Sequence, residues 1–115
     1  MIVQMARVLI AEPSADVRVL LERAVRRLGH EPLVPSAPGA PLPPPPDVLL
    51  LEPAFHGGLE LARALRRDHP HVAIVICSIY PPTAELQALA PAAYVLKPFA
   101  RDTLEDALHA AIAAG

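Results

Sequence analysis

The chain has 115 residues, of which 53% are hydrophobic, 10 are lysine or arginine and 12 are aspartate or glutamate, so its formal net charge is −2. This length predicts a single domain over residues 1–115, and a near-neutral charge without a basic stripe argues against direct binding of nucleic acid. The apolar residues form short runs, and no signal-peptide pattern opens the chain, so we expect a cytoplasmic protein that does not enter a membrane.

Short apolar runs alternate with stretches of helical periodicity, a pattern that predicts a parallel sheet whose strands are joined by helices. The predicted strands span residues 7–11, 30–34, 47–51, 72–77 and 93–96. The first helix is expected to start at the cap Ser14 and to stop at Gly29. The other predicted helices span residues 58–67, with Arg63, Arg66 and Arg67 facing outward, residues 83–90, and the residues from Asp102 onward. A capping box with Glu105 is expected at the start of the last helix.

A proline-rich stretch separates the second and third predicted strands. Residues 35–46 contain seven of the fifteen prolines, which exclude an α-helix there. We interpret the stretch as a stiff spacer that replaces a helix; the alternative is a ligand for a proline-binding module, since residues 41–44 fit PxxP but lack a basic neighbour. Without that helix, apolar surface beside the first two strands loses its cover, and we expect Leu42 or a partner subunit to cover it.

Proline also indicates the order of the strands. Pro32 and Pro35 lie in or beside the second predicted strand, whereas the first, third and fourth contain none. Because proline is tolerated at sheet edges but not in central strands, the second strand is predicted to be an edge. This position fits a doubly wound sheet with the order 2-1-3-4-5.

Two charged residues stand where predicted strands end. Lys97, the only lysine, follows the last apolar run, and Glu52 follows the third. The carboxyl ends of parallel strands share one edge of the sheet, where ligand sites of open α/β folds gather. We therefore expect a cation and a carboxylate in one pocket.

Other candidate residues carry less information. Cys77 lies inside an apolar run and is expected to be a buried thiol without a chemical role. His56 stands beside two glycines and reads as a solvated loop residue, although with Glu12 and Glu52 it could form a transition-metal site. The turn after the first strand has no glycine that would let a phosphate approach the backbone, which weighs against a small-ligand-binding α/β domain.

Five segments, in order along nearly the whole chain, resemble the receiver domains of bacterial two-component response regulators. They are RVLIAEPS from Arg7, PDVLLLE up to Glu52, GLEL from Gly58, IVICS up to Ser78, and YVLKPF from Tyr94. Each motif is weak alone, but five in the family's order form a specific signal. The resemblance implies a flavodoxin-like α/β fold and a role in phosphorelay signal transduction.

The resemblance also assigns positions. Glu52 stands where the family has the phosphoacceptor aspartate, and Glu12 and Pro13 stand where it has the acidic pair that helps to hold Mg²⁺. The other implied positions are the switch hydroxyl at Ser78, the switch aromatic at Tyr94, the phosphoryl-binding lysine at Lys97, and Pro98, whose peptide bond resembles one that is cis in the family.

The departures from the family pattern predict a change of chemistry. Mg²⁺ requires near-octahedral coordination, phosphoryl transfer requires in-line positioning, and Glu52 carries its carboxylate one methylene farther than aspartate. Together with the loss of a ligand at Pro13, this predicts no phosphotransfer, no enzymatic activity, and no resident metal or cofactor. A phosphorylatable receiver is the alternative.

We therefore expect a degenerate receiver that works by binding protein. The resemblance implies that a protein partner or a second copy would bind through the helix at 83–90, the strand at 93–96 and the last helix. Two interpretations of Glu52 stay open. Either its carboxylate reaches Lys97 and Ser78 as a substitute for a phosphorylated aspartate, or it forms a partly buried ion pair that only satisfies two charges.

Overall fold

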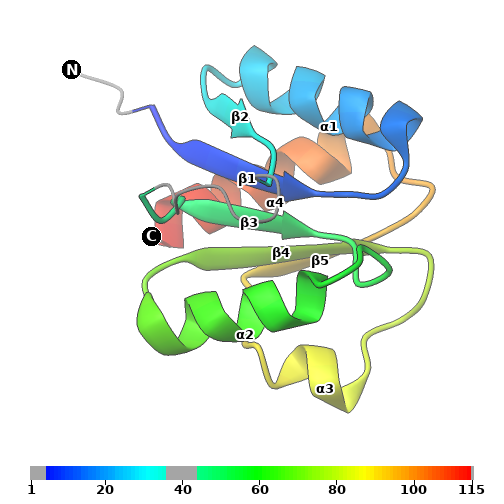
Figure 1. The fold of residues 1–115 in the computed structure, drawn as a ribbon. Helices are drawn as coiled ribbons and strands as arrows, with labels where there is room; N and C mark the ends of the chain where they lie inside the picture. The colour runs from blue at the N-terminus through cyan, green and yellow to red at the C-terminus, as the bar shows by residue number, and fades with distance from the viewer. Residues whose placement is uncertain (1–4, 36–43, 115) are drawn as a thin grey trace.

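The computed structural model describes residues 5–35 and 44–114. Its elements, in chain order, are β1 (Arg7–Ala11), α1 (Ala15–Arg27), β2 (Glu31–Leu33), β3 (Val48–Leu51), α2 (Gly58–Asp68), β4 (Ala73–Ser78), α3 (Ala84–Gln87), β5 (Ala93–Leu96) and α4 (Arg101–Ala114). Figure 1 shows the five strands as one central layer with helices on both sides. None of the helices in these two ranges is both long enough and apolar enough to cross a membrane.

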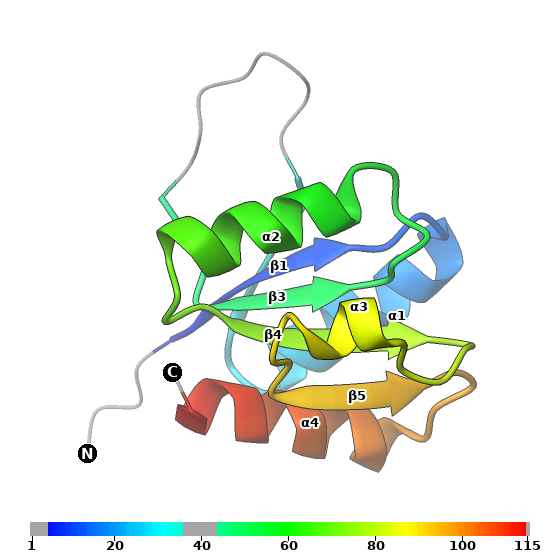
Figure 2. The same cartoon turned by 90° about the horizontal axis from the view of Figure 1, so that it is seen from below.

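The strands form one parallel sheet in the order β2-β1-β3-β4-β5, which confirms the predicted doubly wound, flavodoxin-like topology. Helices α1 and α4 cover one face of the sheet, and α2 and α3 cover the other (Figure 2). The edge position of β2 is confirmed as well. Pro32 pairs with Val8 of β1 on one side only, and the interior strands β1, β3 and β4 contain no proline.

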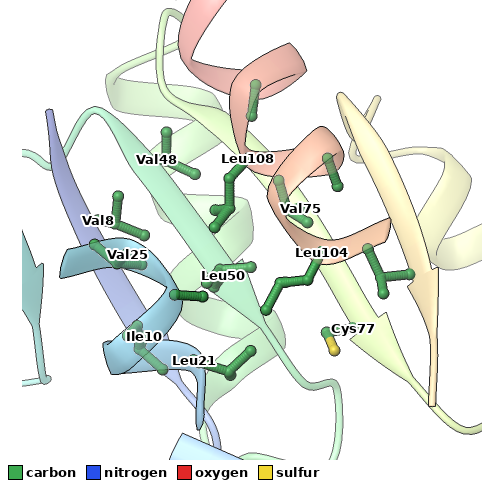
Figure 3. Packing of buried hydrophobic residues seen from close by; sticks show 14 of the residues in the cluster. Val8, Ile10, Leu21, Val25, Val48, Leu50, Val75, Cys77, Leu104 and Leu108 are labelled. Atoms are coloured by element: carbon green, nitrogen blue, oxygen red, sulfur yellow. The ribbon is translucent and has the colours of Figure 1, made fainter. Parts of the chain in front are cut away.

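Both faces of the sheet are apolar, because helices bury both. Under α1 and α4, Leu21, Val25, Leu104 and Leu108 pack on the strands (Figure 3). The opposite core is formed mainly by these residues of the strands and of α2 and α3: Leu49, Leu51, Ala62, Leu65, Ile74, Ile76 and Leu86. Strands buried on both faces read as continuous apolar runs, which explains why the sequence located them well.

Cys77 lies in the core under α1 and α4, as expected for a structural thiol. Burial, as the largest cause, raises its pKa to about 11. The thiolate is the reactive form of cysteine, so this environment keeps the group unreactive at neutral pH.

The helix starts agree with the sequence in three cases out of four, and α2 begins at Gly58 as predicted. Ser14 caps α1, its hydroxyl accepting from the Val17 N–H at 3.4 Å. Thr83 likewise caps α3, but the helix spans only Ala84–Gln87 rather than 83–90. The predicted capping box of the last helix is wrong. Helix α4 begins one residue earlier, at Arg101, and the Glu105 carboxylate instead accepts hydrogen bonds from arginine side chains.

The proline-rich stretch is described only at its two ends. Leu42 and the first three residues of the PxxP segment, 41–43, lie outside the described residues. On the described side, Arg7 anchors the exit of the stretch: its side chain donates to the carbonyls of Pro44 and Pro45 at 3.4 and 3.3 Å. Its backbone N–H donates to the Asp47 carboxylate at 2.7 Å. The described ends contain no helix between β2 and β3, consistent with a proline segment in the place of a helix.

Candidate functional site

The carboxyl edge of the sheet gathers the predicted polar residues. Glu12 follows β1, Glu52 follows β3, Ser78 ends β4 and Lys97 follows β5. These four strands are neighbours in the sheet, so residues far apart in the sequence meet at one point. Glu12 and Ser78 are almost completely buried, while Glu52 and Lys97 are partly exposed. The predicted meeting of a cation and a carboxylate at this edge is therefore found.

The closest partner of Lys97 is Glu12. The Lys97 Nζ donates to Glu12 Oε1 at 2.6 Å, whereas its distance to Glu52 Oε1 is 4.0 Å. The exposed fractions of the three side chains are 15% for Lys97, 2% for Glu12 and 11% for Glu52. The second Glu12 oxygen, Oε2, accepts from the Ser14 backbone N–H at 3.0 Å. Both oxygens of the most deeply buried carboxylate are thus engaged.

Glu52 is less well satisfied. Its Oε2 atom is buried and has no hydrogen-bond partner in the described part of the chain. Burial raises the pKa of Glu52 above its ordinary value; the Lys97 charge opposes this increase, the Glu12 charge adds to it, and the nearby Ser78 hydroxyl lowers it. One ammonium therefore faces two carboxylates, and its short contact goes to Glu12.

A series of hydrogen bonds connects this cluster to Tyr94. The Lys97 backbone N–H donates to the Ser78 carbonyl at 2.8 Å, and the Ser78 hydroxyl oxygen accepts from the Tyr80 N–H at 3.2 Å. The Tyr80 carbonyl in turn accepts from the Tyr94 hydroxyl at 2.6 Å. Tyr94 is half-buried against the core under α2 and α3. The Lys97–Pro98 peptide bond is cis, as the resemblance implied.

The acidic residues at this edge do not fit the Mg²⁺ site that the fold family implies. Pro13 is exposed and has no side-chain oxygen, and both Glu12 oxygens already have donors. Only the Glu52 carboxylate is left, whereas Mg²⁺ requires nearly octahedral oxygen coordination. His56 is exposed, and no group of three or more His, Cys, Asp or Glu residues with metal-binding geometry occurs within residues 5–35 and 44–114.

Solved response regulators are structural neighbours of this chain. NtrX from Brucella abortus matches with a TM-score of 0.80 and 21% identity over 96% of the chain, which spans only 27% of NtrX. The chemotaxis response regulator CheY4 of Vibrio cholerae matches with a TM-score of 0.76 and 20% identity, covering 94% of this chain and 99% of CheY4. The BeF3-activated receiver domain of DrrB matches with a TM-score of 0.75 and 13% identity, covering 96% of this chain and 99% of the DrrB domain.

At these identities the likeness establishes the receiver-type fold, and not the chemistry. No protein-family model matches the sequence, and no curated protein matches it either. The fold places Glu12, Glu52, Ser78 and Lys97 together at one edge. Pro13 has no side-chain oxygen to add to this cluster. Tyr94 is linked to the cluster through Tyr80, a residue that the sequence did not single out.

Proposed function

We propose that this chain is a degenerate receiver domain that takes part in signal transduction by binding protein, without accepting a phosphoryl group and without enzymatic activity. The observation that carries the proposal is the contact between Lys97 and Glu12 at 2.6 Å, beside a glutamate at the phosphoacceptor position. In a phosphorylated receiver the ammonium at this position would bind the phosphoryl group. Here its ammonium is already bound to a buried carboxylate.

The same cluster supports a structural interpretation of Glu52 rather than phosphoryl mimicry. A phosphoryl group offers three strong acceptor oxygens and close to two charges, and it would be expected to capture the lysine directly. Glu52 Oε1 stays 4.0 Å from Lys97 Nζ, and Oε2 has no partner within the described residues. We infer that Glu52 fills the position without reproducing the phosphorylated state.

The first test is phosphotransfer. Incubation with acetyl phosphate and Mg²⁺ is expected to give no acyl-phosphate adduct by intact-protein mass spectrometry and no product with hydroxylamine. The Glu52→Asp variant should also fail, because Pro13 still leaves the metal one ligand short. The double variant Glu52→Asp with Pro13→Asp has both missing groups and is the matched positive control. An adduct that maps to Glu52 in the wild-type protein would refute the proposal.

The contact face that we propose comprises α3, β5 and α4. Strand β5 is the edge of the sheet opposite to β2, and its Leu96 is 52% exposed. Ile79 and Tyr80, which follow the neighbouring strand β4, are also large exposed apolar residues. Ser78 pairs with Leu96 in the register of the two strands, so Ile79, the next residue, lies near Leu96 at this edge. Exposed apolar regions of this kind are typical of protein interfaces.

The Leu96→Glu variant should weaken association through this face by about fivefold, because it places a charge in an apolar contact. Sedimentation equilibrium would measure association with a second copy, and affinity capture from the source cell would measure association with another protein. The control is Leu20→Glu on α1, which is 53% exposed but lies outside this face. Equal effects of both variants, or none, would contradict the assignment of the face.

A further inference from the structure

A pocket of about 550 Å³ lies beside the charged cluster, between the first turns of α1, the end of β2 and the loop after β3. Its wall is formed by apolar residues, Val34, Pro35 and Phe55, and by charged residues, Glu12, Arg18 and Glu22. This volume is within the range of about 300–1,000 Å³ that is typical of small-molecule sites. The pocket also lies outside the carboxyl ends of β2, β1 and β3, where the strand order reverses and doubly wound sheets bind ligands.

The apolar part of the wall is open to solvent. Val34 is 58% exposed, so more than half of its surface is in contact with water. Phe55 and Pro35 are each only partly buried. A flat apolar group in the pocket would remove these three side chains from water, which favours binding in proportion to the area covered.

The charged part of the wall offers one group with unused hydrogen-bond donors. Glu12 is fully engaged by Lys97 and Ser14, as described above. Glu22 is shared between Arg18 and Arg26, each at 3.6 Å, which is longer than a hydrogen bond. The Arg18 guanidinium makes no hydrogen bond to another described residue, although it carries five donors in a planar fork that matches a carboxylate.

We propose that this pocket binds a small organic anion with a flat apolar body, of the class of aromatic carboxylates. The carboxylate would bind the Arg18 guanidinium, and the body would lie against Val34, Pro35 and Phe55. Lys97 is the partner of Glu12, and Arg26 shares the charge of Glu22, so Arg18 is the cation of this wall whose hydrogen-bond donors are left for an anion. The proposal does not depend on the absence of phosphotransfer, because none of these contacts uses Glu52.

The probes are 2-naphthoate, 2-naphthylmethylamine and 2-naphthalenemethanol, which share one apolar body and differ in the charge of the head group. Each would be titrated into the ¹⁵N-labelled full chain and followed by two-dimensional NMR. We expect 2-naphthoate to shift the amides of Arg18, Val34 and Phe55 with a Kd of about 1 mM or below, and the amine and the alcohol to bind at least about tenfold more weakly.

Variants distinguish binding in the pocket from nonspecific attraction of the anion to positively charged side chains. Arg18→Gln should weaken 2-naphthoate binding about tenfold, because it removes a charge-assisted hydrogen bond. Val34→Ser should weaken it by removing part of the apolar wall. Arg23→Gln is the matched control, an exposed arginine of the same helix outside the pocket, and it should leave the Kd unchanged.

Several outcomes would overturn the proposal. They are equal binding of the amine and the carboxylate, equal losses with Arg18→Gln and Arg23→Gln, or the absence of shifts at the pocket up to about 20 mM 2-naphthoate. A phosphoryl adduct at Glu52 would refute the proposed signalling chemistry but would leave this result untouched, so the two failures can be told apart.

Discussion

Replacing Lys97 with methionine is expected to lower the free energy of unfolding by about 3–5 kcal/mol at pH 7, the usual cost of removing one partner from a buried ion pair. The large effect arises because a single ammonium is the nearest counter-charge of two carboxylates. Glu12 is 2% exposed and Glu52 is 11% exposed, so neither can regain water when the lysine is lost. Methionine keeps most of the apolar stem, which limits the change to the charge. Urea denaturation at pH 7 measures the effect.

A second substitution distinguishes loss of charge balance from loss of packing. If the uncompensated Glu12 carboxylate is the cause, Lys97→Met combined with Glu12→Gln should recover most of the stability. The exposed Arg23 provides the matched control, and Arg23→Met should change the free energy of unfolding by less than about 0.5 kcal/mol. A loss below about 1 kcal/mol for Lys97→Met would contradict the account of the cluster.

The sheet was largely predictable because its signals are local and strong. Strands buried on both faces gave continuous apolar runs, and Pro32 and Pro35 marked the edge. These signals placed the second strand at an edge, a position that fits the doubly wound order 2-1-3-4-5. The short helix α3 was less predictable. The sequence identifies its N-cap, Thr83. Ala90, however, has a φ of 51°, a left-handed conformation that the sequence does not reveal for an alanine.

The members of the charged cluster were predictable, but their pairing was not. Parallel strands bring their carboxyl ends together whatever the side chains are, so Glu12, Glu52 and Lys97 had to meet. Which carboxylate takes the lysine depends on side-chain rotamers and on competing donors. The Ser14 backbone N–H orients one oxygen of Glu12, and the other then accepts from Lys97. No sequence pattern encodes that arrangement.

The hydrogen bonds of two further polar residues could not be predicted from the sequence. Arg66 was expected to face outward on α2, but its guanidinium donates to the carbonyls of four residues, Pro70, Val72, Leu89 and Ala90. These carbonyls lie in the short turns after α2 and α3, where no N–H of a further helical turn can reach them. Only the tertiary fold brings Arg66 close enough to donate to them. His30 is buried, and its Nδ1 accepts from the Ala6 N–H at 2.9 Å. A single histidine before a strand gives no sign of that bond.

Glu52→Gln is expected to raise the free energy of unfolding at pH 7 by about 1–2 kcal/mol, because it removes the charge from a carboxylate with a buried, unpaired oxygen. The pKa of Glu52 is raised in the folded chain, mainly by burial, from an ordinary value of 4.5. A raised folded pKa means that folding favours the neutral carboxyl, so the charged form destabilises the wild-type protein above that pKa. The variant lacks this cost.

The sign of the effect predicts its pH dependence. The advantage of Glu52→Gln should be complete above the folded pKa of Glu52, and should decline as the pH falls to 4.5 and below, where the wild-type carboxyl is neutral in both states. Glu105→Gln is a control of opposite sign. Burial raises the pKa of Glu105, but hydrogen bonds from Arg101 and Arg27 outweigh this and hold it below the ordinary value. That variant should be less stable than wild type at pH 7, and its deficit should fade in acid. A loss of stability for Glu52→Gln at pH 7 would contradict this account, because it would mean that the charged carboxylate makes net favourable interactions in the folded protein.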